Sequence, residues 1–314
     1  PERGPTAWIP RSGLRMTPAF GGTAERLQLD LGGHRLGVIL ERSGPRSAPL
    51  WLLLPALSTV SSRGEWKPMA QAVGDQRHLV SFDWPGFGES DRPAITYDAS
   101  FLRSALRAVL TYLRATHPGR ITVVGAGHSA SIALGLAGEW SARWQSLVAV
   151  APTWRGPLPT MTGWPPQQFS WLQQVIAAPL IGPALYRLNT SRAVLKLMLR
   201  RHVWLDPDLL TPQRIREQQQ LARRPGARFA SVAFVSGGLD PAVDRAWWLQ
   251  QARMLQCPLQ LVVAAQAPPR SRSEMEALSA AADRVSVVPG RLGLHQEFGA
   301  LLARQLLETV ASFD

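Results

Sequence analysis

Short apolar runs alternate with longer helical patterns along most of the chain. Apolar runs such as 50–54 and 147–150 predict strands buried on both faces, because they lack the polar alternation of a half-exposed strand. The alternation predicts an α/β fold with a mostly parallel sheet flanked by helices. The expected strands are 26–31 and 35–41, which form a hairpin around Gly32-Gly33, and 50–54, 78–83, 121–124, 147–150, 259–264 and 285–288; the expected helices are 66–73, 101–116, a small-residue helix ending near 140, 273–282 and 298–312.

The middle of the chain departs from this alternation. From 154 to about 230 the pattern is helical and no strand is expected, and after Asp240 the alternation resumes. An all-helical insertion inside an α/β repeat predicts a cap over the core. We therefore expect a first core part at 1–153, a helical cap at 154–230 after the sixth strand, and a second core part at 231–314.

Composition and length are typical of a globular protein. The chain has 314 residues, of which 46% are hydrophobic and 18% charged. Its longest apolar run, 50–57, is interrupted by Pro55 and falls short of the ~20 residues of a membrane span. Segment 1–13 lacks the apolar core of a signal peptide. The single cysteine, Cys257, cannot form an internal disulfide, so a cytoplasmic location is expected.

The formal net charge of +12 comes almost entirely from arginine, since Lys67 and Lys196 are the only lysines. A GC-rich genome produces the same bias, and the arginines are scattered rather than gathered with aromatic residues. We therefore expect no nucleic-acid partner. Segment 191–204 mixes basic and apolar residues, which fits either a solvated charged face over a buried stripe or a peripheral contact with an anionic membrane surface.

The sequence 83–91, Asp-Trp-Pro-Gly-Phe-Gly-Glu-Ser-Asp, follows an expected buried strand. Here the chain resembles the α/β-hydrolase superfamily, whose members carry a D-x-P-G-x-G-x-S stretch after the fourth strand. Element order, the cap and a late histidine, His295, agree with this resemblance, which implies an α/β-hydrolase fold of the capped, esterase-like or lipase-like kind. Asp83 in such a loop is expected to be a structural hydrogen-bonding residue.

In this superfamily the nucleophile lies on a tight turn between a strand and a helix, flanked by small residues. Two registers fit the present chain. In one, Ser129 is the nucleophile. In the other, the segment 121–137 follows the family pattern without a gap, and Gly127 stands at the nucleophile position, which leaves that position vacated.

Helix packing favours Gly127. The family keeps small residues two, three, six and ten positions after the nucleophile, where the helix lies against the sheet. Counted from Gly127, these positions hold Ser129, Ala130, Ala133 and Ala137. Counted from Ser129, the last of them is Glu139, a carboxylate where close packing is expected.

The expected acid position is vacated as well. The family places an Asp a few residues after the seventh strand, where this chain has Ala267. Asp240 and Glu274 are weak substitutes, since a role as a turn residue and as a charge near a helix start explains them better. His295 follows the last strand, where the resemblance places the catalytic base. The resemblance therefore implies a degenerate triad.

The surroundings of the turn also depart from the family pattern. Pro55-Ala56 replaces the usual His-Gly, so the expected oxyanion donors are the N–H groups of Leu57 and of His128, or of Ala130 in the Ser129 register. His128 is also a candidate pocket group. Trp84 and Trp154 are the expected aromatic residues of the pocket.

A different class of protein fits one motif at the same place. Gly125-x-Gly127-x-x-Ala130 matches a dinucleotide fingerprint between a strand and a helix. The acidic residue that should close the next strand is missing, because 147–150 runs into Ala151-Pro152. We therefore expect no nucleotide, and no other cofactor or metal.

The leading hypothesis is a pseudoenzyme-like protein that binds an apolar small molecule or ester in a pocket between cap and core, or that acts on it by non-standard chemistry. The alternative is an active serine esterase that uses Ser129 and His295. A dinucleotide-binding protein and a scaffold that merely kept the fold are weaker alternatives.

Overall fold

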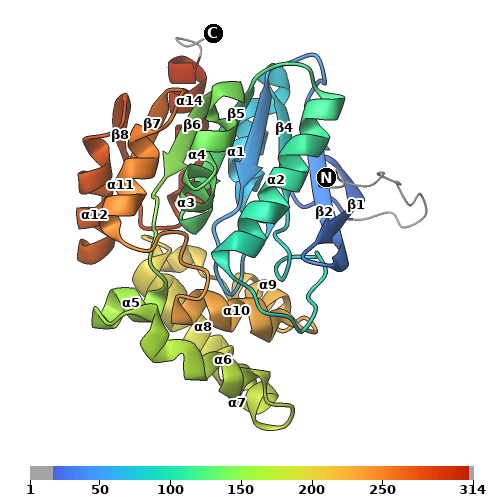
Figure 1. Ribbon diagram of the computed structural model, residues 1–314, viewed down its shortest axis with the longest axis vertical. Coiled ribbons are helices and arrows are strands. Elements are labelled where there is room, and N and C mark those ends of the chain that lie inside the picture. Colours follow the sequence, from blue (N-terminus) through green and yellow to red (C-terminus); the bar gives the residue numbers. More distant parts are fainter. Residues whose placement is uncertain (1–16, 311–314) are drawn as a thin grey trace.

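Eight strands form one sheet in the computed structural model, which describes residues 17–310. The sheet has the order β1-β2-β4-β3-β5-β6-β7-β8 (Figure 1). β1 pairs with β2, and β2 with β4, in antiparallel fashion; all other pairs are parallel. The strands are β1 (Thr23–Leu31), β2 (His34–Ser43), β3 (Leu50–Leu54), β4 (His78–Phe82), β5 (Ile121–Ala126), β6 (Trp144–Val150), β7 (Leu259–Ala264) and β8 (Arg284–Val288).

Helices cover both faces of this sheet. On one face lie α2, α3, α11 and α12, in which α2 and α11 pack against α3, and α12 packs against α11 (Figure 1). On the other face, α1 packs against α14. This double cover explains why β3, β4 and β5 are buried along their whole length, including the polar residues His78, Ser81 and Thr122. The core helices are α1 (Lys67–Val73), α2 (Ala99–Thr116), α3 (His128–Leu134), α4 (Ala137–Trp140), α11 (Arg245–Arg253), α12 (Pro269–Ser279), α13 (Leu294–Glu297) and α14 (Gly299–Val310).

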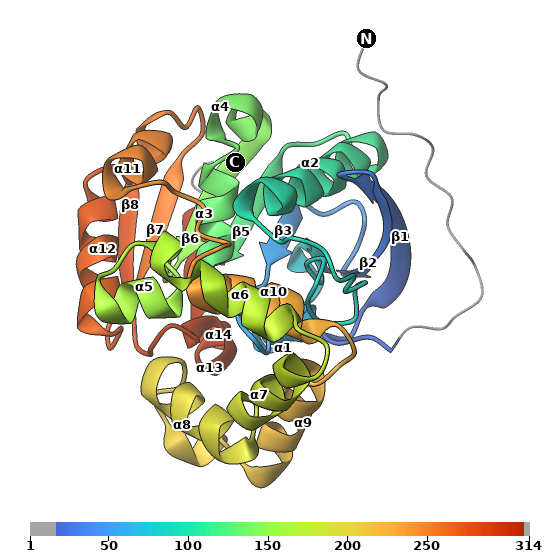
Figure 2. The ribbon, with the colours of Figure 1, turned by 60° about the horizontal axis from the view of Figure 1, so that its bottom comes forward.

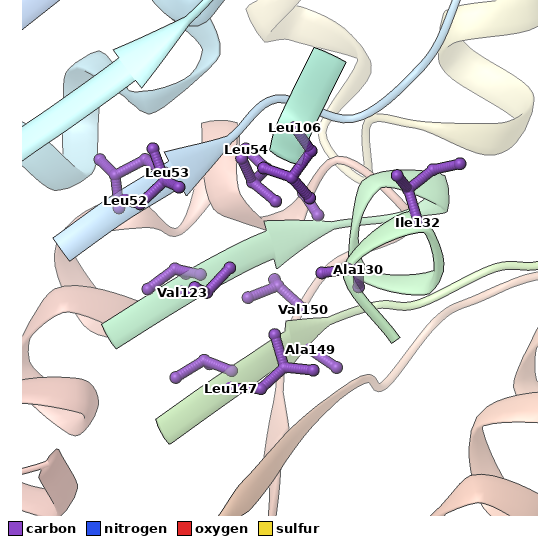
Figure 3. Close-up of a cluster of buried hydrophobic side chains, with 14 of the residues drawn as sticks. Leu52, Leu53, Leu54, Leu106, Val123, Ala130, Ile132, Leu147, Ala149 and Val150 are labelled. Atoms are coloured by element: carbon purple, nitrogen blue, oxygen red, sulfur yellow. The ribbon is translucent and has the colours of Figure 1, made fainter. Parts of the chain in front are cut away.

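The hydrophobic core lies between the central strands and the helices around them. Figure 3 shows side chains of β3, β5 and β6 gathered beside α3, together with labelled residues of α2 and of α3 itself. The labelled residues are Leu52, Leu53, Leu54, Leu106, Val123, Ala130, Ile132, Leu147, Ala149 and Val150, and all of them are buried. This core fixes the end of β5 and the start of α3, where the candidate site lies.

The cap consists of the helices between β6 and α11. Figure 1 shows it at the end of the molecule where β6 ends, and Figure 2 shows its helices from below. A small apolar cluster within the cap joins α8 to α9 through Leu199 and Ile215. Its helices are α5 (Pro157–Thr162), α6 (Ser170–Ala177), α7 (Ile181–Asn189), α8 (Arg192–His202), α9 (Pro212–Ala222) and α10 (Ala227–Ser236).

Short 3-10 helices connect several of these elements. They are η1 (Arg63–Trp66), η2 (Gly74–Gln76), η3 (Ser141–Arg143), η4 (Pro166–Phe169) and η5 (Pro207–Leu209). The expected hairpin is present, and its turn residues Gly32 and Gly33 have φ values of +56° and +79°. Such angles strain residues other than glycine.

Three expectations about elements differ from the structure. The helix expected to run to about 140 divides at Gly135 into α3 and α4. The helix α11 was not expected; its start is capped by Asp244, whose side chain accepts the Trp247 N–H at 2.7 Å. The last cap helix, α10, runs to Ser236, past the expected boundary at 230. Segment 1–13 and the last expected helical residues, 311–312, lie outside the described residues.

Within residues 17–310, no helix combines the length and apolar character that crossing a membrane requires. The same residues contain no group of three or more His, Cys, Asp or Glu side chains arranged to hold a metal ion.

Candidate functional site

Gly127 forms the turn between β5 and α3. Its backbone has φ +54° and ψ −127°, a conformation that strains any residue with a Cβ atom. The Gly127 N–H donates to the carbonyl of Val150 at 2.9 Å, which ties the turn to the end of β6. The structure therefore places Gly127, not Ser129, at the strand-to-helix turn.

The first glycine of the fingerprint, Gly125, has a packing role. A Cβ atom on Gly125 would lie 2.7 Å from the Ala130 Cα and 2.8 Å from its nitrogen. Gly125 therefore allows α3 to lie directly against β5, and the close approach accounts for the motif without a nucleotide. It also packs the Ala130 amide against the strand, so Ala130 is poorly placed as an oxyanion donor.

A Cβ atom on Gly127 would fit without a clash. Apart from the two chain neighbours, the described residues place only the Ala56 Cβ, at 3.5 Å, and the Thr153 Oγ1, at 3.7 Å, within 4 Å of the ideal Cβ position. Both are ordinary van der Waals distances. The turn thus has room for a Cβ atom at this position.

Ser129 is fully buried in the first turn of α3 and has two structural partners. Its hydroxyl donates to the carbonyl of Pro55 and accepts from Trp84 Nε1 at 3.0 Å. Trp84 Nε1 also lies 3.1 Å from the Pro55 oxygen. Trp84, expected in the pocket, is itself completely buried, so it and Ser129 join α3 to the loop after β3.

His295 lies on α13, after β8, and is completely buried. Its Nε2 is 3.0 Å from Glu65 Oε2, and its ring lies 4.9 Å from that of Trp66. Nδ1 has no hydrogen-bond partner among the described residues. The structure brings His295 to Glu65, and it brings neither Ser129 nor Asp240 to His295.

Glu65 is the residue that the sequence analysis missed. It lies on η1, and its Oε2 also accepts the Ala56 N–H at 3.0 Å. Burial raises the pKa of Glu65, although the His295 imidazole and the donated N–H groups lower it in part. The N–H of Ala56 thus binds Glu65, and its Cβ lies next to the Cβ position of Gly127. Ala56 therefore connects the Glu65–His295 pair to the turn.

A second buried pair lies on the other side of the turn. His128 Nδ1 is 2.7 Å from Thr153 Oγ1, and Nε2 is 3.4 Å from Asp240 Oδ1. Asp240 Oδ1 also accepts the Gly156 N–H at 2.7 Å, whereas Oδ2 has no hydrogen-bond partner in the described chain. Asp240 is thus the partner of His128 and not an acid for His295.

Neither the vacated acid position, Ala267, nor the substitute Glu274 provides a carboxylate partner for His295. Ala267 is buried in the loop between β7 and α12, and its N–H donates to the Ala264 carbonyl at 3.1 Å. Glu274, on α12, forms an ion pair with Arg245 at 2.9 Å. The position after β7 therefore supplies no carboxylate to the imidazole.

A cavity of about 370 Å³ opens between the core and the first cap helix. Thr153, Trp154, Arg270 and Glu274 are among its lining residues, so its wall is mixed rather than purely apolar. A second cavity, of about 340 Å³, includes Ile121 and Trp144, the first residues of β5 and β6. It therefore lies at the opposite edge of the sheet from Gly127.

The motif 83–91 has a structural role in the described chain. The buried Asp83 carboxylate accepts the N–H groups of Arg63 and Glu89 and pairs with the Arg63 guanidinium. Arg63, only 1% exposed, also bonds to the carboxylates of Glu41 and Glu89. This cluster holds the loop after β4 against β2 and η1, as expected for Asp83.

Comparisons with solved structures find the same fold in several enzymes. An enol-lactonase from Burkholderia xenovorans LB400 is 13% identical, with a TM-score of 0.67 over 90% of this chain and 99% of its own. A thermophilic esterase from Thermogutta terrifontis is 17% identical, with a TM-score of 0.68 over 92% and 98%. An epoxide hydrolase is 17% identical, with a TM-score of 0.64 over 93% and 100%. At these identities the likeness concerns the fold alone.

Comparison with the sequences of curated proteins finds no significant match. The model of the Alpha/beta hydrolase family matches residues 51–301, which include the Gly127 turn, the cap and His295. This match spans most of the chain, and the order and direction of the strands agree with it. The chain belongs to the alpha/beta hydrolase family.

Proposed function

We propose that this protein binds a lipophilic carbonyl compound, an ester or a carboxylic acid, beside the Gly127 turn and does not form an acyl-serine there. One observation carries the proposal: the residue with φ +54° and ψ −127° between β5 and α3 is a glycine. A nucleophile on that turn needs a hydroxyl, thiol or carboxylate, and Gly127 has no side chain.

The surroundings of the turn support ligand binding. The Cβ position of Gly127 is bordered by Ala56 and by the Thr153 hydroxyl, both at ordinary contact distances. The backbone N–H groups of Leu57 and His128 have no acceptor among the described residues, so both are available to a ligand carbonyl oxygen. Trp154 adds an aromatic wall in the neighbouring cavity, which favours an apolar ligand.

The serine esterase alternative has less support from the same geometry. Ser129 uses its hydroxyl to join Pro55 and Trp84, and the nearest acid to His295 is Glu65, bound at Nε2. A general base must reach the proton that it removes. Ser129 and His295 do not form such a pair.

Thermal unfolding with and without ligand tests the proposal. Long-chain esters and acids should raise the melting temperature of the wild type, because a ligand that binds only the folded state stabilises it, whereas short polar acids should not. Ala56→Phe, which fills the space at the turn, should abolish this shift. Ala142→Phe, which projects into the distant cavity, is the matched control and should keep it. Equal shifts with Ala56→Phe and wild type would contradict binding at this place.

A second candidate function, acyl transfer through Thr153, is favoured by the His128 contacts. A carboxylate only accepts hydrogen bonds, so Asp240 favours the His128 tautomer with a proton on Nε2; in this tautomer Nδ1 can accept the Thr153 hydroxyl. This order of hydroxyl, imidazole and carboxylate matches that of a catalytic triad. The hydroxyl lies 3.7 Å from the position where a Cβ on Gly127 would be.

In this reaction Thr153 Oγ1 attacks the ester carbonyl carbon while its proton passes to His128 Nδ1. The bond to the alcohol oxygen then breaks, and the alcohol leaves with that proton. Water then attacks the carbonyl carbon of the threonine ester while His128 Nδ1 takes a proton from it. The bond from this carbon to Thr153 Oγ1 breaks, the carboxylic acid leaves, and the proton returns to Oγ1.

Fluorophosphonate treatment followed by peptide mass spectrometry separates the two candidates. Binding without acylation predicts an unmodified protein. Acyl transfer predicts a label on Thr153 that Thr153→Ala removes, Thr153→Ser keeps and His128→Ala slows. A label on Ser129 would contradict both.

A further inference from the structure

The cap carries most of the exposed large hydrophobic side chains in the described part of the chain. There are fourteen of these side chains, and ten belong to residues 157–236. Leu180 is 87% exposed, Leu188 70% and Trp164 61%. The ten are Met161, Trp164, Trp171, Leu180, Ile181, Leu185, Leu188, Leu197, Met198 and Leu209. Such a concentration marks an interaction surface, because isolated exposed residues would be spread over the molecule.

The helix α7 shows the pattern most clearly. Ile181, Leu185 and Leu188 are spaced four and three residues apart, so they share one face of the helix, and all three are exposed. Gly182 and Tyr186 lie on the buried side, where the Tyr186 hydroxyl donates to the Ala222 carbonyl at 2.9 Å. The apolar outer face of α7 therefore has no partner within the described chain.

The charged side chains of α6, α7 and α8 are all basic. From 140 to 205 the sequence contains no Asp or Glu, and it contains seven basic residues: Arg143, Arg155, Arg187, Arg192, Lys196, Arg200 and Arg201. Five of these, from Arg187 onward, are exposed on α7 and α8, beside exposed Leu197 and Met198. In Figure 2, α6 lies across the front of the cap, and α7 and α8 lie below it toward the lower margin.

We propose that this surface, the outer side of α6–α8, docks on an anionic lipid membrane. A bilayer surface offers apolar depth for the leucines and the exposed Trp171, and anionic headgroups for the cations. A second copy of the chain is less suitable, because a two-fold interface would bring the same cations together with no carboxylate from 140–205 to neutralise them. The docking is independent of the proposed ligand site.

Sedimentation with vesicles tests the proposal on the full chain. Wild type should bind phosphatidylcholine vesicles that contain phosphatidylglycerol, and bind pure phosphatidylcholine vesicles much more weakly. Binding should fall steeply between low and high salt, because salt screens the attraction. The double reversal Arg200→Glu/Arg201→Glu should lower the partition coefficient by at least about tenfold.

A matched control keeps the total charge change equal. Arg253→Glu/Arg304→Glu alters two exposed arginines on α11 and α14, away from the cap, and should lower binding by less than about twofold. Leu185→Gln/Leu188→Gln should also weaken binding, whereas Val285→Gln/Val287→Gln on β8 should not. All eight positions are exposed, so unchanged melting temperatures will show that the variants fold.

Three results would overturn the proposal. One is equal binding to neutral and anionic vesicles. Another is an equal loss of binding in the two arginine variants. The third is a wild-type protein that does not bind vesicles but forms a dimer in analytical ultracentrifugation, with Leu185→Gln/Leu188→Gln dissociating this dimer. That result would assign the surface to a second copy of the chain.

Discussion

Nε2 of His295 lies 3.0 Å from Oε2 of Glu65, and both side chains are buried. This pair gives the late histidine a fixed orientation although Ala267 stands where the family acid is expected. The Glu65 oxygen that meets His295 also accepts the Ala56 N–H, so the pair is attached to the loop beside Gly127. His295 therefore has a positioning partner even though the turn itself carries no nucleophile.

Removing the Glu65 carboxylate should destabilise the fold. Glu65→Ala leaves the His295 imidazole and the Ala56 N–H without their partner in a buried place, and each such loss costs about 1–3 kcal/mol. Urea denaturation measures the free energy of unfolding. Glu276→Ala, at an exposed ion pair with Arg272, should change it by less than about 0.5 kcal/mol. Equal effects of the two substitutions would show that the pair is energetically unimportant.

The pH dependence of stability should carry the signature of Glu65. Its pKa is raised above the usual 4.5 by burial, so the folded state holds the proton more tightly than the unfolded state. The difference in the free energy of unfolding between wild type and Glu65→Gln should favour wild type most below pH 4.5. This advantage should be lost as the pH rises through the folded-state pKa of Glu65. A relative stability that increases with pH over this range would reverse the assigned direction.

Ser129→Ala should reduce stability and leave ligand binding intact. The substitution removes the hydroxyl that connects the Pro55 carbonyl and Trp84 Nε1, at a cost of about 1–3 kcal/mol for a buried hydrogen-bonding group. Ser47→Ala, in an exposed loop, is the control and should be nearly neutral. Chemical denaturation and ligand titration of both variants check the prediction. Loss of binding with unchanged stability would instead assign Ser129 to the ligand site.

Arg63→Met should be strongly destabilising. The buried guanidinium bonds to Glu41, Asp83 and Glu89, and removing one partner of a buried ion cluster costs about 3–5 kcal/mol. The expected loss should appear as a lower urea midpoint with an unchanged slope. Arg272→Met, at a half-exposed pair on α12, should leave the midpoint almost unchanged. A similar small effect at Arg63 would refute the structural role given to the motif 83–91.

The sequence favoured Gly127 over Ser129 at the turn because close packing of a helix on a strand requires small residues at fixed positions. Small residues at 129, 130, 133 and 137 fit a helix that approaches a strand closely, and the Gly125 contact with Ala130 shows this approach. The expected cap, the hairpin and the order of strands rest on equally local patterns of apolar and turn-forming residues. For this reason the α/β-hydrolase fold could be predicted in most of its elements.

The partners of the two histidines could not be predicted in this way. Glu65 and His295 are separated by 230 positions, and His128 and Asp240 by 112. Locally, Ser62-x-x-Glu65 has the spacing of a helix capping box, and both capping contacts are present. That local role explains a carboxylate at position 65 without reference to His295, so no sequence signal indicated the pair.

Fluorophosphonate labelling with mass-spectrometric localisation tests the vacant turn most directly. Wild type should carry no label on Ser129, because Gly127 holds the turn and Ser129 is buried against Pro55 and Trp84. Gly127→Ser should label slowly at the introduced hydroxyl and lose about 1–3 kcal/mol of stability to backbone strain, and adding Ala267→Asp should speed the labelling. A label on Thr153 would favour the second candidate function, acyl transfer through Thr153, and would agree with a turn that carries no nucleophile. Stoichiometric labelling of wild type that Ser129→Ala abolishes and His295→Ala slows would contradict the account.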